Sequence, residues 1–568
     1  MTVKKPNSVQ ELLQWEWADL EPAYQELQNQ SLTKANVNAW LSDWSSVKEL
    51  AEEMYDRLYV ATTVNTADKD AETRFHAYME KLYPNLMEAE QKLKEKLLSS
   101  QLKPEGFEMP LHRMQAEAEI FRSENLPLLV NEENINNEHD KVMGAQTATW
   151  HGEEKTIRQL EAVLREPDRN LRTDAWQVLS DRQLQDREVI NGQWQRYVDL
   201  RLKLAQNANQ PDYRAYRWLQ MTRFDYTPAD CKSFHRAIED VVVPVVARLA
   251  KRRCERLGIK TLRYYDIFVD PSGLPILKPF ANVSELIETC TSIFKKVHPR
   301  LGGFFDQMNR EGLLDLENRK HKAAGGYCTT FAWSRRPFVF SNAVGMHEDV
   351  QVVLHEGGHC FNDFESYALP YLQQRYIPNE FAEVASMGME YLCMAFLSKA
   401  EGGFYSPRDA ARAELEFHEE GLRFWPYMAL VDAFQHWVYD NPQLARDPAN
   451  CDACWGQLEQ RFRPYIDWSG EEEVMRTGWQ RKDHIHQTPF YYVEYGLAQL
   501  GAAQIWLNFQ KDRATAVKSY LKALALGGSV PLPDLYRTAG AKLAFDAVTL
   551  RQAAEAMEKR IQELEDSL

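Results

Sequence analysis

The sequence predicts a mostly α-helical protein with a small β-sheet, and three observations support this fold class. Apolar residues recur at three- and four-residue spacing through long charged segments, which is the period of one helix face. Strand-like segments are few. No repeat of solenoid length and no low-complexity tract interrupts this pattern. We therefore expect an N-terminal helical lobe over 1–190 and a larger C-terminal domain over 191–568.

The expected elements follow from these two periodicities. Helical spacing marks 37–62, 70–100, 154–166, 170–208 and 228–257, and the chain closes with the amphipathic segment LRQAAEAMEKRIQELEDSL. Strand-like patterns mark 261–269, 325–333 and 337–342. Because these strands come shortly before residue 355, we expect a small sheet beside that region.

The composition of the 568 residues is that of a globular protein. Hydrophobic residues make up 44%, charged residues 26% and aromatic residues 11%. These proportions exclude a wholly disordered, collagen-like or coiled-coil chain. A chain this long and aromatic can bury a large core without disulfides or structural metals.

The net charge of the chain and the length of its hydrophobic segments limit the binding partners and the cellular location that we expect. With 83 acidic and 67 basic residues the formal charge is −16, so we expect no nucleic-acid partner. The start of the sequence has no apolar signal region, and the most apolar run, VVVPVVARLA, is too short to span a membrane. The eight cysteines are sparse, which is typical of reduced thiols. We expect a cytoplasmic protein with no membrane partner.

The sharpest motif is His355-Glu356-Gly357-Gly358-His359. Four residues advance a helix by about 400°, so the two histidines lie about 40° apart on one face. Two imidazoles placed in this way can share one cation, typically Zn²⁺. The glutamate lies about 100° further round, where it reaches a metal-bound water rather than the metal. The alternative interpretation is a solvated helix turn.

A third ligand is expected in the segment PNEFAEVASMGMEYL, because catalytic zinc usually takes three protein ligands and one water. Asn379 follows Pro378 and is expected to cap a helix that carries Glu383 and Glu390 on one face. Their neighbours are apolar, and an uncompensated carboxylate there would be costly. We expect Glu383 to bind metal and Glu390 to accept a hydrogen bond from a ligand. The alternative is two carboxylates on an exposed face.

Gly357 and Gly358 are expected in a helix interior, where each costs about 1 kcal/mol relative to alanine. Close approach of another backbone would explain them. The GGY run at 325–327 is one candidate neighbour, and a glycine turn is the alternative.

A third region, HIHQTPFYYVEYGLAQLG, contains His484 and His486 before an aromatic helix start. Such aromatic stretches usually belong to a core. However, Tyr492 and Tyr495 share a helix face, and phenols with an imidazole are suitable donors to a developing oxyanion.

Together, HEGGH, FAEVAS with Glu383, and the HxxxxPFYYVEYGLAQLG pattern resemble the zinc metallopeptidases of the oligoendopeptidase F and thimet oligopeptidase family. The segments PFVFSNAVGMHEDVQVVLHEGGH and ALALGGSVPLPDLYRTAGAKLAFD are also similar to that family. The similarity covers roughly 320–545, and the N-terminal part carries no sharp motif.

The resemblance implies an almost all-α, two-lobed body around a deep channel that admits short unfolded peptides and excludes folded proteins. It implies that His355, His359 and Glu383 bind one Zn²⁺ on the channel wall, and that Glu356 is the general base. The catalytic domain is then the part over 191–568.

The resemblance also implies that His484, Tyr492 and Tyr495 position the substrate and stabilise the tetrahedral intermediate. His484 matches the family histidine better than His486, because eight residues separate it from Tyr492.

The sequence departs from the family at two positions. Asn362 stands where a histidine often follows the second metal histidine, and Cys360 replaces a small residue. Neither is expected to be a ligand, because their side chains point off the metal face. We expect local polarity and sensitivity to oxidants to differ.

The sequence therefore predicts a zinc endopeptidase that acts on short peptides, with no prediction for its oligomeric state. Two alternatives remain: a zinc exopeptidase of carboxypeptidase or dipeptidase type, and a non-catalytic helical scaffold with a vestigial motif. Glu356 and His359 also fit one half of a di-iron carboxylate site. That site needs a second E-x-x-H, which the 14 histidines do not supply.

Overall fold

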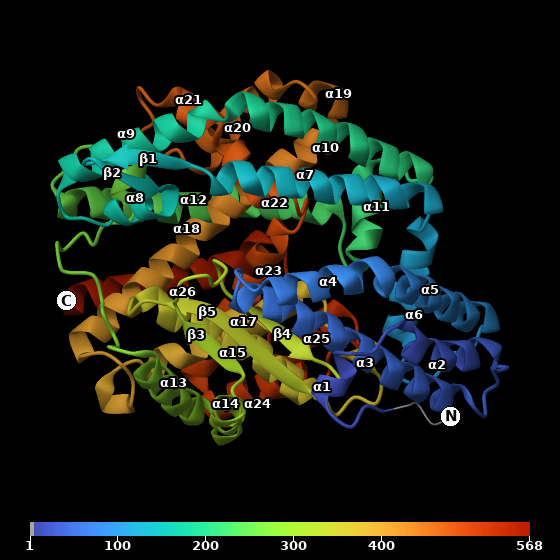
Figure 1. Cartoon of the computed structure of the whole chain (residues 1–568). Coiled ribbons are helices and arrows are strands. Elements are labelled where there is room, and N and C mark those ends of the chain that lie inside the picture. The colour runs from blue at the N-terminus through green and yellow to red at the C-terminus, as the bar shows by residue number, and fades with distance from the viewer. Residues whose placement is uncertain (1–4) are drawn as a thin grey trace. The chain divides into compact units, whose positions relative to one another are not determined.

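The structure is a computed structural model that describes residues 5–568, and helices dominate it (Figure 1). The predicted mostly α fold with a small sheet is confirmed. The residues form two compact units, each built from three segments. Unit 1 contains the described residues up to Ala118, with Leu277–Ala413 and Gly501–Leu543; unit 2 contains Glu119–Ile276, Glu414–Leu500 and Ala544–Leu568. The assignment of 1–190 to a helical lobe and of 191–568 to a catalytic domain stays a prediction.

Unit 1 combines helices with a three-stranded sheet. Its elements are α1 (Val9–Leu12), α2 (Trp17–Asn29), α3 (Val37–Val64), α4 (Lys69–Lys81), α5 (Tyr83–Ser100), most of α6 (Glu108–Ile120), α13 (Val283–Val297), α14 (Pro299–Arg310), β3 (Leu314–Glu317), β4 (Tyr327–Phe331), β5 (Arg336–Ala343), α15 (His347–Ser366), α16 (Leu372–Arg375), α17 (Asn379–Cys393), α24 (Arg513–Leu524) and α25 (Leu532–Thr538).

Unit 2 combines helices with one β-hairpin. Its elements are α7 (Leu126–Gly144), β1 (Thr147–Trp150), β2 (Glu153–Thr156), α8 (Ile157–Val163), α9 (Arg169–Gln185), α10 (Arg187–Asn207), α11 (Tyr213–Gln220), α12 (Pro228–Leu257), α19 (Pro442–Ala445), α20 (Pro448–Phe462), α21 (Glu472–Arg476), α22 (Asp483–His486) and α26 (Ala547–Ser567). The unit boundaries at 413/414 and 500/501 fall inside α18 (Pro407–Asp440) and α23 (Tyr492–Lys511).

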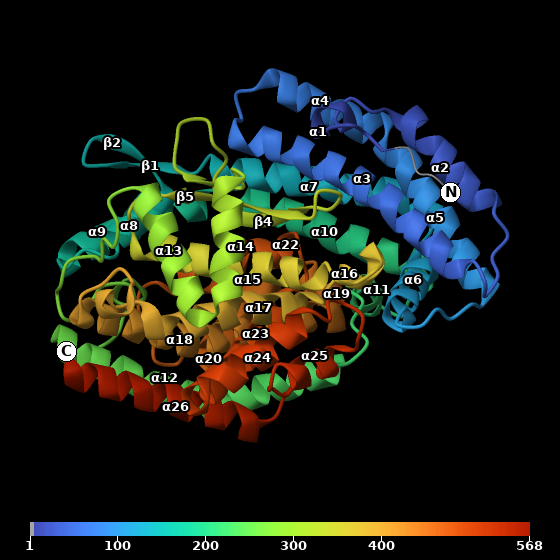
Figure 2. The same cartoon turned by 90° about the horizontal axis from the view of Figure 1, so that it is seen from below.

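The sheet of unit 1 has the order β3-β5-β4, with β5 parallel to β3 and antiparallel to β4. Strand β5 is almost wholly buried, as its apolar sequence RPFVFSNA requires, and α15 packs against it. Figure 2 shows α13, α14 and α15 as neighbouring helices in this unit. The expected sheet beside residue 355 is thus confirmed.

Several predicted helices contain breaks that the periodicity did not show. The segments 37–62 and 228–257 form α3 and α12, whereas 70–100 is divided at Leu82 into α4 and α5. Pro84 lies in the first turn of α5, where its missing N–H leaves no hydrogen bond unmade. The segment 170–208 is divided at Asp186, whose carboxylate accepts hydrogen bonds from Gln146 and Arg182.

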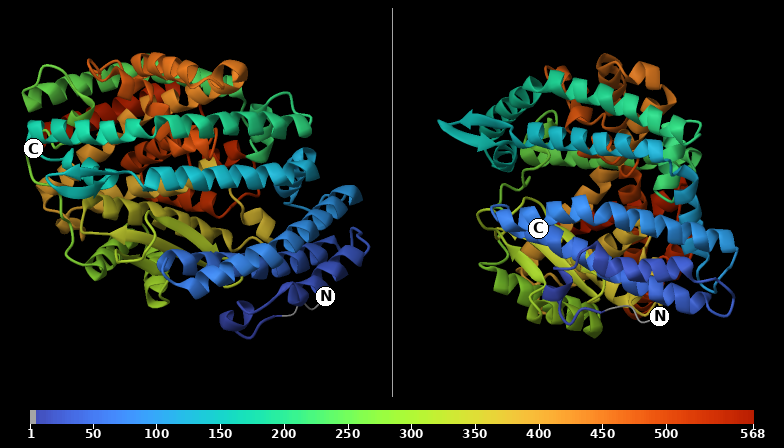
Figure 3. Two further views of the ribbon diagram at one scale, coloured as in Figure 1. Left: turned by 45° about the horizontal axis from the view of Figure 1, so that its top comes forward. Right: turned by 45° about the vertical axis from the view of Figure 1, so that its right-hand side comes forward.

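Two predicted segments near β-structure need correction. The segment 154–166 begins in β2, which pairs with β1, before α8 starts; Figure 3 shows this hairpin as a pair of teal arrows. The predicted strand 261–269 is wrong, because it is a loop with one 3-10 turn at Tyr264–Asp266. The buried Asp266 carboxylate accepts hydrogen bonds from Arg169 and Arg172, and these contacts fix the loop without a partner strand.

Each unit has its own apolar core. The cluster in unit 1 includes Trp40 and Trp44 on α3, whose ring centroids lie 5.1 Å apart. The cluster in unit 2 surrounds Trp176 on α9. The predicted C-terminal helix is confirmed as α26, and it packs along α12 (Figure 2). Within residues 5–568 no helix is both long and apolar enough to cross a membrane.

Candidate metal centre

Helices α15 and α17 of unit 1 approach each other closely, and glycine makes this approach feasible. A Cβ on Gly358 would lie 2.5 Å from both the carbonyl oxygen of Ala385 and the Cα of Ser386 on α17. A Cβ on Gly357 would lie 2.5 Å from Cζ of Phe294. Close backbone approach therefore explains Gly358, but its neighbour is α17 and not the run at 325–327.

The start of α17 differs from the expectation in one detail. Pro378 is the N-cap residue and Asn379 is the first residue of the helix, so Asn379 does not cap it. The Pro378 carbonyl accepts the backbone N–H of Phe381 at 2.9 Å and that of Ala382 at 3.0 Å. Because α17 begins here, Glu383 lies in its second turn, beside α15.

Three of the predicted residues converge between these helices. One donor atom from each of His355, His359 and Glu383 lies within 4.8 Å of the other two. Glu383 Oε2 is 3.5 Å from His355 Nε2 and 4.0 Å from His359 Nε2. In a tetrahedral site with bonds of about 2.0–2.1 Å the ligand atoms are about 3.3 Å apart. The three donors therefore fit one small cation once Glu383 and His359 move closer together.

Neighbouring polar groups orient two of these donors. His355 Nδ1 lies 2.7 Å from Glu390 Oε1, which leaves Nε2 directed at the cluster. Ser386 Oγ lies 3.2 Å from Glu383 Oε2 and donates to that carboxylate. Glu390 was predicted from the sequence, whereas Ser386 was not, although its position three residues after Glu383 places both on one helix face.

The pKa values in this cluster are those of a charged carboxylate, Glu383, between two imidazoles. Burial lowers the pKa of His359 to about 4, so this imidazole is neutral at physiological pH. Burial opposes protonation of His355 too, but the hydrogen bonds that its ring donates to the Glu383 and Glu390 carboxylates outweigh burial and hold its pKa well above the usual value. Burial raises the pKa of Glu383, yet its two histidine neighbours outweigh that effect and lower it. A bound cation would replace the proton on His355.

Glu356 lies on the same helix, next to His355, and is 9% exposed. Burial raises the pKa of its carboxyl to about 7, against the opposing effect of the His355 charge. An acid that titrates near neutral pH can both accept and return a proton, which is the requirement for general acid–base chemistry.

The two residues at which the sequence departs from the family lie outside this cluster. Cys360 Sγ is 3.5 Å from Cys328 Sγ on β4, and Asn362 is buried. The contact between the two thiols was not predicted, because it joins a helix to a strand that precedes it by 32 residues.

The third predicted region forms an aromatic cluster within unit 2. The ring centroid of His484 lies 5.0 Å from that of Tyr492 and 5.9 Å from that of Tyr495. By contrast, His486 is fully buried and stacks on His139 at 4.4 Å. Of the two histidines, His484 therefore accompanies the tyrosines. The roles of His484, Tyr492 and Tyr495 toward a substrate stay predictions.

Comparisons with known proteins agree with this fold. The structure of PZ peptidase A with inhibitor 2 is 27% identical, covers 100% of this chain and 99% of its own, and has a TM-score of 0.87. Oligoendopeptidase F of Lactococcus lactis subsp. cremoris is 23% identical over 57% of this chain and 52% of its own length. An oligoendopeptidase F homolog of Borreliella burgdorferi is 22% identical over 54% and 52%.

The match to these two curated relatives thus spans about half of their length. The model of peptidase family M3 matches residues 162–555, which is more than half of the chain and includes both the HEGGH motif and Glu383. The members of this family are metallopeptidases, and the protein described here belongs to peptidase family M3.

Proposed function

We propose that the protein is a zinc-dependent endopeptidase that hydrolyses internal bonds of short unfolded oligopeptides. The observation that carries this proposal is the convergence of His355, His359 and Glu383 with a neighbouring acid, Glu356, whose pKa is close to neutral. Two imidazoles and one carboxylate are a typical catalytic zinc set, which leaves one coordination position open. One catalytic Zn²⁺ per chain fits the three donors.

Each residue then has a separate task. Zn²⁺, when bound, supplies a Lewis acid that polarises the scissile carbonyl and acidifies a water molecule. Glu356 accepts a proton from the attacking water and passes it to the leaving amine nitrogen. Glu390 holds the imidazole of His355 in the orientation that presents Nε2.

The aromatic cluster of unit 2 is proposed to contribute hydrogen-bond donors. Tyr495 or His484 donates to the oxyanion that develops on the scissile carbonyl, and Tyr492 positions the substrate. This assignment is supported by the family membership and by the proximity of the three rings to one another. A channel that admits only short peptides and a cytoplasmic location belong to the same proposal.

The experiment is cleavage of an internally quenched peptide with both ends blocked, with and without a zinc chelator. Cleavage at an internal bond that the chelator abolishes and added zinc restores is the expected result. A peptide of the same sequence with free ends is run in parallel, because an exopeptidase would trim this peptide and leave the blocked one intact. Absence of cleavage of both peptides, with no bound zinc, would contradict the proposal and favour the scaffold interpretation.

A further inference from the structure

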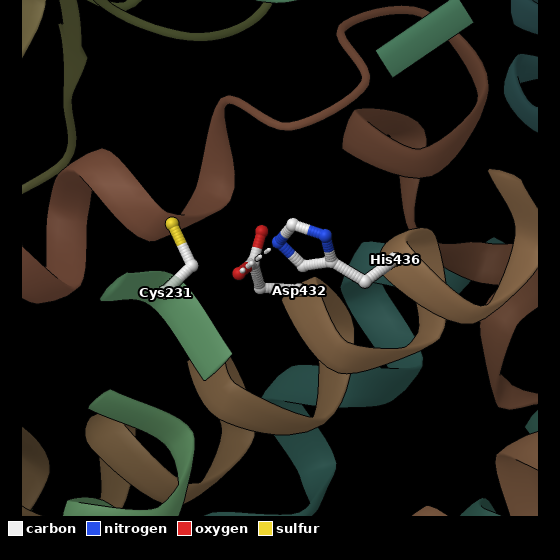
Figure 4. Close-up of side chains that lie close together, drawn as sticks. All are labelled: Cys231, Asp432 and His436. Atoms are coloured by element: carbon white, nitrogen blue, oxygen red, sulfur yellow. Dashed lines mark ion pairs between the residues drawn. The ribbon is translucent and has the colours of Figure 1, made fainter. Parts of the chain in front are cut away.

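A second group of metal-ligand residues lies inside unit 2, apart from the site described above. Cys231 comes from α12, and Asp432 and His436 come from α18. One ligand atom of each lies within 4.8 Å of the other two. Figure 4 shows the Asp432 carboxylate between the sulfur of Cys231 and the imidazole of His436.

The spacing of these atoms is close to that of a tetrahedral cation site. Asp432 and His436 lie one helical turn apart, with Nε2 of the imidazole 3.4 Å from Oδ2 of the carboxylate. Bonds of about 2.0–2.3 Å to nitrogen, oxygen and sulfur place tetrahedral ligand atoms about 3.3–3.6 Å apart. The Asp–His pair already has this separation, and the thiol of Cys231 completes three donors.

Two polar atoms in this group, one on Asp432 and one on His436, are buried without a hydrogen bond to the described residues 5–568. Exposure is 0% for Cys231, 0% for Asp432 and 2% for His436. Asp432 Oδ1 and His436 Nε2 make no hydrogen bond to any part of the chain that the structure describes. A buried polar atom left in this state destabilises a protein by about 1–3 kcal/mol. A cation bound by both atoms would remove that penalty.

The surrounding side chains also support a bound ion. His235 Nε2 lies 2.7 Å from Asp432 Oδ2, so this histidine orients the carboxylate and is at hand as a fourth donor. Arg214 Nη1 lies 3.4 Å from His436 Nδ1 but only 2.6 Å from Asp440 Oδ1. When a cation binds Nε2 of His436, Nδ1 of the same ring carries the proton. The Arg214 guanidinium then keeps its contact with Asp440 and loses the longer one with His436.

We propose that Cys231, Asp432 and His436 bind a second Zn²⁺, which links α12 to α18 within unit 2. A thiolate with an imidazole and a carboxylate selects zinc over the hard cations Mg²⁺ and Ca²⁺. The thiol releases its proton to solvent when the sulfur–zinc bond forms. Because all three donors are buried, the role is structural, in contrast to the proposed catalytic zinc. The competing account is a metal-free hydrogen-bonded triad of His235, Asp432 and His436.

The first test measures zinc per chain by elemental analysis of the full-length protein after dialysis against buffer with dilute zinc. We expect Cys231→Ser to bind one zinc ion fewer than the wild type, because serine keeps the size but loses the thiolate. Cys454→Ser is the matched control, since Cys454 is also buried in unit 2 but lies outside the group. Equal zinc content in the wild type and Cys231→Ser would overturn the proposal.

The second test uses Co²⁺ in place of zinc, because a thiolate ligand to cobalt gives a near-ultraviolet charge-transfer band. The donors of the unit 1 cluster include no thiolate, so the band does not come from that cluster, and its loss in Cys231→Ser assigns it to Cys231. We expect it in the wild type and in His359→Gln, and its absence in Cys231→Ser. A wild-type protein without the band overturns the proposal and favours the metal-free triad, whatever the peptidase activity.

If Cys231→Ser does not fold, a variant of another proposed ligand tests the same site. His436→Gln should also bind one zinc ion fewer than the wild type. His418→Gln, at a buried histidine in the same helix α18, is its control and should retain full zinc content. Full zinc content in a folded His436→Gln protein would contradict the assignment.

Discussion

The two metal-ligand clusters of this chain are built alike but differ in solvent access and in the acid that lies beside the unit 1 cluster. Each takes two residues four positions apart on one helix and a third from a neighbouring helix. In unit 1 the side chains of His355 and His359 are 27% and 23% exposed. In unit 2 the three residues are at most 2% exposed.

The ligand carboxylates of both clusters, Glu383 and Asp432, have lowered pKa values, but the unit 1 cluster also has a neighbouring acid, Glu356, whose pKa is raised. Burial raises the pKa of Glu356 to about 7, so this carboxyl can exchange protons near neutral pH. Burial acts in the same direction on Asp432, but His436 and His235 outweigh it and lower its pKa, so it stays charged. Ligand spacing alone therefore does not distinguish a reactive site from a structural one. A reactive site is distinguished by its access to solvent and by a nearby acid that titrates near neutral pH.

The largest effect is expected from Glu356→Gln. Loss of the proton acceptor should lower kcat by about 10²–10⁴-fold. Zinc content should not change, because the ligands remain. Turnover of the blocked peptide and zinc per chain are measured on the same sample. Glu348→Gln, at an exposed position of the same helix, is the control and should keep wild-type turnover. Substantial turnover by Glu356→Gln would show that Glu356 is not the proton acceptor, and this acid would then no longer distinguish the unit 1 cluster from the unit 2 cluster.

A smaller loss is expected from Glu390→Gln, which weakens the hydrogen bond to His355 Nδ1 without removing a ligand. Zinc affinity at the unit 1 cluster should fall by about 10–100-fold. Competition with a chromophoric chelator measures this affinity. If affinity is unchanged while turnover falls, Glu390 does not act through His355.

Gly358→Ala tests the helix contact that positions Glu383. The added Cβ would meet the backbone of α17 at 2.5 Å, and overpacking of this kind lowers the free energy of unfolding by about 1–3 kcal/mol. Gly303→Ala in α14 is the control, since its Cβ meets nothing within 4 Å. Urea unfolding of both variants should show a loss only for Gly358→Ala. Equal stability of the two variants would show that α15 and α17 are not packed as described.

The smallest effect is a pH dependence that arises in unit 2. A carboxyl whose pKa is lower in the folded protein stabilises it above the unfolded value of about 3.9 and loses this effect as the pH falls below that value. The metal-free wild type should therefore lose stability in acid more steeply than Asp432→Asn, which has no such group to protonate. Chemical unfolding from neutral to acid pH measures both slopes. Parallel slopes would mean that Asp432 is not held in its charged form.

The sequence predicted the unit 1 cluster well because its determinants are local. The pair His355 and His359 follows from helix geometry, and Glu383 follows from one nearby helix. The break at Asp186 and the loop around Asp266 were missed, because each depends on side-chain contacts to other segments. The unit 2 cluster was missed for the same reason, since Cys231 and Asp432 lie 201 residues apart. The pairs Cys231/His235 and Asp432/His436 show the four-residue spacing, but no sequence rule brings them together.

The most direct test of the central claim is turnover of the end-blocked peptide as zinc is added back to metal-stripped protein. The claim is that the cluster of His355, His359 and Glu383 is the catalytic one. We expect the wild type to regain activity and His359→Gln to stay inactive even when it binds zinc elsewhere. Recovery of wild-type turnover by His359→Gln would contradict it.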